Sequence, residues 1–241
     1  MVDAGVLNAD AHSALIDRAA LDAAIRAQGA EFQNAITDAH AHLFADVVVF
    51  VTRKQVERMQ AVIAAVEEGV TFLPSVRGEP VEPQALQSQT LRQAQGERTK
   101  EQSALGVFYG YDFHLNAQGV HLIEINTNAG GAFLNGLLID SQRDAGLLGK
   151  VMADESLEQV FLNMFRNEWR LTHGDAPLTT IAMVDEQPKS QYLYPEFLLA
   201  KAMFDRAGIT THIVDPSALQ ARENCLYVGE QKIDLIYNRL T

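Results

Sequence analysis

The stretch Gly110–Gly131 alternates apolar and polar residues on either side of a glycine, which is the pattern of a β-hairpin. Successive side chains of a strand point to opposite faces, so Val120, Leu122, Glu124 and Asn126 share one face. Glu124 and Asn126 then lie roughly 7 Å apart along the backbone. From that spacing, both side chains can reach one ion.

The turn of this hairpin decides which residue faces Glu124. A three-residue loop that ends in a left-handed Gly119 is a favoured hairpin form, and it pairs Asp112 with Glu124. Two opposed carboxylates repel one another, so a cation between them would stabilise the pair. Carboxylate and amide oxygens suit Mg²⁺. A four-residue loop would move Asp112 to the other face, and an ordinary solvated hairpin would show the same alternation.

The segment Leu122–Gly131 resembles the metal-binding strand and following loop of the ATP-grasp superfamily, whose signature is an acidic residue on one strand and Glu-x-Asn on the next. The resemblance implies that Mg²⁺ bridging the phosphates of ATP is held by three metal ligands. It also implies that the small-residue loop after the strand approaches the nucleotide closely. The implied metal ligands are Asp112, Glu124 and Asn126, and the implied ATP-binding residues are Asn128, Gly130 and Gly131.

Composition excludes several classes of protein. At 241 residues with 47% hydrophobic content, the chain can bury a substantial core. A formal charge of −12 argues against a nucleic-acid surface or an anionic membrane surface. Cys225 is the single cysteine, the N-terminus has no signal-peptide pattern, and no apolar run reaches membrane-spanning length. We therefore expect a cytoplasmic protein, and a homo-oligomer is possible.

Four segments of the first two-thirds of the chain predict scaffold elements. Ser13 is a candidate N-cap for a helix that runs to about Gln28, and Gly69 a candidate stop for a helix over 56–69. The apolar run within 46–52 predicts a buried strand. A helix over 156–170 is predicted to begin at a capping Ser156, with Gln159 three residues on. Its predicted buried stripe is Leu157, Val160, Phe161, Met164 and Phe165.

Residues 75–102 are rich in Gln, Glu, Arg and Pro and lack apolar periodicity, which predicts a disordered or inserted loop. Segments 76–82 and 91–98 resemble the translated halves of a bacterial palindromic repeat. We hypothesise that a mobile inverted repeat was inserted here, and the nucleotide sequence of the gene tests this. A flexible functional lid is the alternative.

From Thr179 onward the pattern is strand, helix, strand, over 180–184, 195–207 and 208–214, which predicts a βαβ unit with parallel strands. Further strands are expected at 226–228 and 233–237. Ligands of open α/β sheets bind at the carboxyl ends of strands, where Asp185, Glu186, Asn238 and Arg239 lie. Arg239 is the candidate catalytic residue, because a guanidinium can clamp a carboxylate or phosphate with two bonds.

This last stretch resembles the small α/β domain that precedes the nucleotide-binding part of ATP-grasp enzymes. Here it follows the Glu-x-Asn strand, an order similar to circularly permuted relatives of glutathionylspermidine synthase. The resemblance implies an α/β fold class: a partial ATP-grasp-like α+β domain over 1–74 and 103–175, then a small open α/β domain over 176–241. The lysines that contact ATP are expected beyond this domain, so the chain resembles one truncated at its C-terminus.

The resemblance implies a magnesium-dependent and ATP-dependent ligase that joins a carboxylate to an amine through an acylphosphate. Two alternatives remain open. One is an inactive remnant or non-catalytic binding protein without the ATP clamp. The other is a metal-dependent amidohydrolase, because His40 and His42 have the His-x-His spacing of two zinc ligands.

Overall fold

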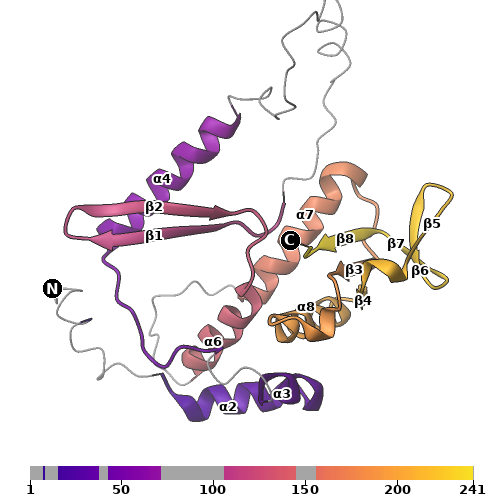
Figure 1. Cartoon of the computed structure of the whole chain (residues 1–241), viewed down its shortest axis with the longest axis horizontal. Helices are drawn as coiled ribbons and strands as arrows, with labels where there is room; N and C mark the ends of the chain where they lie inside the picture. The colour runs from indigo at the N-terminus through magenta and orange to yellow at the C-terminus, as the bar shows by residue number, and fades with distance from the viewer. Residues whose placement is uncertain (1–7, 9–15, 38–42, 72–105, 145–155, 241) are drawn as a thin grey trace, which may run out of the picture.

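The computed structural model describes residue 8 and residues 16–37, 43–71, 106–144 and 156–240, which form a mixed α/β fold with several small sheets (Figure 1). The predicted insert over 75–102 and the pair His40 and His42 lie outside these residues. No helix among the described residues is both long and apolar enough to cross a membrane.

A three-stranded parallel sheet organises the C-terminal part. Strand β3 (Thr180–Val184) lies between β4 (Thr210–Val214) and β8 (Leu235–Asn238). Every residue of β3 is buried, as expected for the central strand of a sheet covered on both faces. Helix α8 (Tyr194–Arg206) connects β3 to β4, with its N-terminus near Pro195, so the predicted βαβ unit is confirmed.

The second face of that sheet is covered by a small antiparallel sheet of β5 (Leu219–Arg222), β6 (Cys225–Val228) and β7 (Gln231–Ile233). Glu223 and Asn224 have positive φ, the conformation that a tight two-residue hairpin turn requires. The strand predicted over 233–237 corresponds to β8, but it begins two residues later, because Ile233 ends β7.

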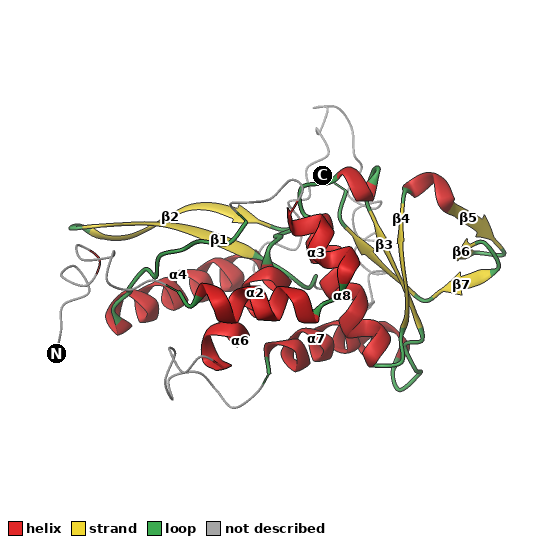
Figure 2. Ribbon diagram, turned by 90° about the horizontal axis from the view of Figure 1, so that it is seen from below, coloured by secondary structure: helices red, strands yellow, loops and turns green. Residues whose placement is uncertain are grey.

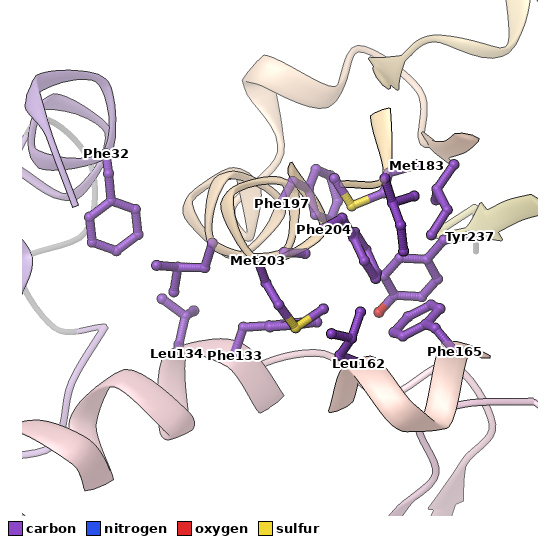
Figure 3. Packing of buried hydrophobic residues seen from close by; sticks show 14 of the residues in the cluster. Phe32, Phe133, Leu134, Leu162, Phe165, Met183, Phe197, Met203, Phe204 and Tyr237 are labelled. Carbon is purple, nitrogen blue, oxygen red and sulfur yellow. The ribbon is translucent and has the colours of Figure 1, made fainter. Parts of the chain in front are cut away.

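Helix α8 packs on the first face, and four further helices share one hydrophobic core with it and the sheet (Figures 2 and 3). They are α2 (Arg18–Ala27), α3 (Ala30–Thr37), α6 (Ala132–Asp144) and α7 (Leu157–His173). Phe165 of α7 meets Phe204 and Tyr237 edge-on, with ring centroids 4.9 and 5.0 Å apart. The core therefore combines residues from both sides of the predicted domain boundary at 175–176, which stays a prediction.

A long hairpin and one helix extend away from this core (Figure 1). The hairpin consists of β1 (Gly110–Asn116) and β2 (Gly119–Asn126), and it packs on α4 (Arg53–Thr71). The side chains of Tyr111, Phe113 and Leu115 on β1 are half-buried, whereas those between them are exposed. The hairpin thus has one face towards protein and one face towards solvent.

Several predicted boundaries are wrong. The run Val47–Val51 is no buried strand: Val47 makes a single bridge, and Val49 is 73% exposed. Asp17 caps α2 by accepting a hydrogen bond from the Ala20 N–H, and α4 continues through Gly69 to Thr71.

Helix α7 also differs from its prediction. It begins after Ser156 as expected, but the serine side chain makes no capping hydrogen bond. Of the predicted stripe only Phe165 is fully buried, and Val160 is 40% exposed. Leu162 and Glu168 are buried instead, so the inward face is rotated relative to the prediction.

Candidate functional site

The hairpin pairs Asp112 with Glu124 by a route different from the predicted one. Its turn contains two residues, 117 and 118, because Asn116 pairs with Gly119. From the turn, this register pairs Asn116 with Gly119 and Phe113 with Leu122. If it continued unchanged, Asp112 would pair with Ile123. A β-bulge after Leu122 leaves Ile123 without a cross-strand partner and shifts the pairing by one residue. The predicted three-residue loop is therefore wrong, and the predicted pairing of the two carboxylates is correct.

The three predicted metal ligands lie on one face of the hairpin. Residues directly opposite each other on two strands extend to the same face, and Asp112 and Glu124 both point to solvent. Asn126 pairs with Gly110, two residues before Asp112, and a Cβ on Gly110 would lie 3.4 Å from the Asn126 Cβ. Two carboxylates and an amide thus share one edge of the solvent face.

Two carboxylates and an amide can hold Mg²⁺ only if waters or phosphate oxygens complete its octahedral coordination. In the part of the chain that the structure describes, no group of three His, Cys, Asp or Glu side chains could hold a metal ion by itself. His114 and His121 face each other further along the same exposed surface, and the His121 ring is hydrogen-bonded to Asn116 at 3.2 Å. A metal at this candidate set would therefore have to arrive with a ligand that supplies further oxygens.

After β2 the chain turns into α6, and a buried carboxylate fixes this turn. Glu196, in the first turn of α8, is 2% exposed. Its Oε2 accepts the Gly131 N–H at 2.7 Å and its Oε1 accepts the Phe133 N–H at 3.1 Å. A carboxylate at a helix N-terminus satisfies orphan N–H groups and complements the helix dipole. Sequence analysis missed Glu196, because nothing in the pattern of α8 marks it.

The structure brings Arg239 to the same turn. Arg239 is 7% exposed and follows β8. Its Nη1 donates to the Asn128 side chain at 2.8 Å, to the Ala129 carbonyl at 3.0 Å and, more weakly, to the Asn128 carbonyl at 3.3 Å. The guanidinium also lies 5.5 Å from the centre of the Tyr237 ring. The candidate catalytic residue and the candidate ATP-binding loop are therefore in direct contact.

Both candidate glycines have a structural reason to be glycine. A Cβ on Gly130 would overlap Leu193 Cδ1 and would lie 2.8 Å from Arg239 Nη2. Gly131 has a φ of +91°, a backbone conformation that other residues rarely adopt. Close packing of the turn against α8 and Arg239 accounts for both positions, and their contact with ATP stays a prediction.

The buried environment perturbs two tyrosines near this turn. Burial, opposed by the charge of Arg239 and assisted by that of Glu196, raises the pKa of Tyr237 to about 12. Burial and a hydrogen bond to Glu31 at 2.9 Å raise the pKa of Tyr194 to about 12. Both phenols therefore stay protonated at physiological pH.

Two hollows flank the turn. One, of about 460 Å³, lies at the carboxyl ends of β3 and β8 and is lined by Asp185, Glu186 and Arg239 among others. The other, of about 590 Å³, lies between α7 and β8 and is lined by Asn128, Glu168 and Trp169 among others. Trp169 stacks on His173 and donates its indole N–H to the Ala176 carbonyl at 2.7 Å.

A comparison with protein-family models finds none that matches the chain, and none of the curated proteins compared with it matches.

Proposed function

We propose that the chain is part of an ATP-dependent carboxylate–amine ligase of ATP-grasp type. The observation that carries this proposal is the register of the hairpin, which pairs Asp112 with Glu124 on the face that also carries Asn126. Opposed carboxylates are unfavourable without a cation. The bulge at Ile123 creates this pairing, because the register set by the turn would otherwise pair Asp112 with Ile123.

In the proposed reaction, the phosphates of Mg-ATP complete the metal coordination begun by Asp112, Glu124 and Asn126. The substrate carboxylate attacks the terminal phosphate, ADP leaves, and an acylphosphate forms. The amine then attacks the acyl carbon and displaces inorganic phosphate. Positioning and neutralisation of charge supply the catalysis, as in other phosphoryl transfers.

Arg239 serves this proposal in two ways. Through Nη1 it holds the turn that follows the metal-binding strand. Its position at the carboxyl end of β8 also directs it towards a hollow in which a substrate carboxylate would bind.

Binding of Mn²⁺, with and without ATP, tests the proposal in the full chain. Mn²⁺ substitutes for Mg²⁺ at oxygen sites and is detected by its paramagnetism. We expect ATP and Mn²⁺ to tighten each other's binding, and Glu124→Ala to abolish this mutual effect. Asp175→Ala, which removes an exposed carboxylate elsewhere, is the matched control. Equal nucleotide affinity in Glu124→Ala and the parent chain would contradict the metal assignment.

A non-catalytic binding protein is the second candidate, and one observation favours it. Two groups expected to face a ligand, the Gly131 N–H and Arg239 Nη1, are engaged by internal partners. Such a protein would bind Mn-ATP as above but would release no ADP with any carboxylate and amine pair. The amidohydrolase alternative rests on His40 and His42, which lie outside the described residues.

A further inference from the structure

The hollow at the carboxyl ends of β3 and β8 has the size and lining of a small-molecule site. Its volume of about 460 Å³ lies within the usual range for such sites. The acidic residues Asp185 and Glu186 and the basic residue Arg239 all line it. Leu193 and Phe197 supply an apolar wall. Side chains of both charges and of apolar character therefore converge on one space.

Arg239 has one edge of its guanidinium unused. All of its side-chain hydrogen bonds within the described residues are made by Nη1. Its Nε is buried and has no hydrogen-bond partner in the part of the chain that the structure describes. Glu196, the nearby buried carboxylate, uses its two oxygens on backbone N–H groups of α6. The Nε–Nη2 edge is one that accepts a carboxylate with two parallel hydrogen bonds.

Asp185 lies level with Arg239 on the neighbouring strand. Val184 pairs with Asn238, and the Arg239 N–H donates to the Val184 carbonyl at 2.9 Å. The next residues on these parallel strands are therefore about 4.8 Å apart along the sheet. Yet none of the ion pairs among the described residues joins Arg239 to Asp185 or Glu186. Opposite charges thus line one hollow without neutralising each other.

We propose that this hollow binds a small zwitterion of the α-amino-acid type. Its carboxylate would bind the free edge of Arg239, its ammonium would bind Asp185 and Glu186, and its side chain would pack on Leu193 and Phe197. A simple anion would meet the two acidic side chains, and a simple cation would meet the arginine. A zwitterion satisfies both. This inference rests on the proposed ligase function, in which the zwitterion would be a substrate.

Titration of the full chain with each of the twenty common L-amino acids tests this inference. The titrations are followed by ligand-observed NMR in buffer with EDTA and without nucleotide. We expect saturable binding of at least one amino acid. The N-acetyl form and the carboxamide form of the best ligand should each bind about tenfold more weakly, because each lacks one charged hydrogen-bonding group.

Variants at the rim of the hollow identify the site without disturbing its buried arginine. The double variant Asp185→Asn, Glu186→Gln should weaken binding of the free amino acid but leave that of its N-acetyl form unchanged. Glu230→Gln, at a carboxylate that is 90% exposed in the β6–β7 turn, is the control and should bind normally. Arg239→Gln should abolish binding if it folds, and the rim variant decides the question if it does not.

The inference is overturned if none of the twenty amino acids binds saturably, if N-acetylation has no effect, or if the rim variant binds as the parent chain does. Its failure is distinct from failure of the ligase proposal. Amino-acid binding that persists while Glu124→Ala leaves Mn-ATP affinity unchanged would retain the zwitterion site and remove the ligase. The reverse result would retain the metal site alone.

Discussion

The charged side chains at the turn before α6 and those on the hairpin differ in burial and in hydrogen bonding. In the turn, Glu196 and Arg239 are less than a tenth exposed, and both are hydrogen-bonded to backbone groups. On the hairpin, Asp112 and Glu124 are exposed and opposite each other, and neither has a hydrogen bond or ion pair within the described residues. Buried charges here hold the fold together, whereas the exposed pair leaves its oxygens available to a ligand.

The comparison predicts the largest loss of stability at Glu196. Glu196→Ala should lower the free energy of unfolding by about 3–5 kcal/mol, because it leaves the buried N–H groups of Gly131 and Phe133 unsatisfied. Urea unfolding followed by circular dichroism measures this. Glu196→Gln, which keeps one acceptor, should lose less, and Asp112→Ala should lose almost nothing. Equal losses at Glu196 and Asp112 would break the distinction between the two regions.

A second prediction concerns how the free energy of unfolding changes at high pH. Because the folded state keeps Tyr237 protonated up to a pKa of about 12, whereas the unfolded chain releases this proton near pH 10, the folded state binds more protons between these values. The stabilisation is therefore complete below pH 10 and is lost as the pH rises towards 12. The loss is about 2–3 kcal/mol. Tyr237→Phe should show a shallower decline between pH 9 and 11.5, and an unchanged decline would contradict it.

Glycine to alanine substitutions should have opposite signs in the two regions. Gly130→Ala should destabilise by about 1–3 kcal/mol, because its Cβ would overlap Leu193 beside Arg239. Gly69→Ala should stabilise by about 0.5–1 kcal/mol, because it lies within α4 and nothing is within 4 Å of the added Cβ. Thermal unfolding of both variants checks the signs. A destabilised Gly69→Ala would show that α4 is packed more closely than the structure describes.

The smallest effect should be seen at Glu124. Without metal, Glu124→Gln should slow amide hydrogen exchange in β1 and β2 by an amount equivalent to a few tenths of a kcal/mol, because it removes the repulsion from Asp112. With Mg-ATP present the parent hairpin should become the more protected of the two. If the variant is less protected in both conditions, the carboxylates do not repel one another appreciably.

Sequence patterns predict what depends on local regularity. The βαβ unit was predictable because a buried parallel strand is continuously apolar and its helix is bounded by Pro195 and Gly208. The pairing of Asp112 with Glu124 was predicted through the wrong turn, because a bulge leaves no clear trace in alternation. The run Val47–Val51 has high β propensity but lies exposed, since propensity does not supply a partner strand.

The buried polar turn was only half predictable. Arg239 and Gly131 could be singled out by residue type and by position at the ends of elements. Glu196 could not, because its role depends on α8 and α6 meeting, and these helices are more than 50 residues apart in the chain. A carboxylate in the first turn of a helix ordinarily reflects that helix's own dipole. Here it serves the N-terminus of a different helix.

The unpaired Ile123 divides the hairpin into two segments whose strand registers differ by one residue. Between the turn and Ile123, the two-residue turn sets the register. Between Ile123 and the base of the hairpin, the shifted register places Asp112 opposite Glu124. Deleting Ile123 would let one unbroken register run from the turn to the base, with Phe113 opposite Leu122 and Asp112 still opposite Glu124. Loss of the bulged residue during evolution would therefore leave the two carboxylates opposed.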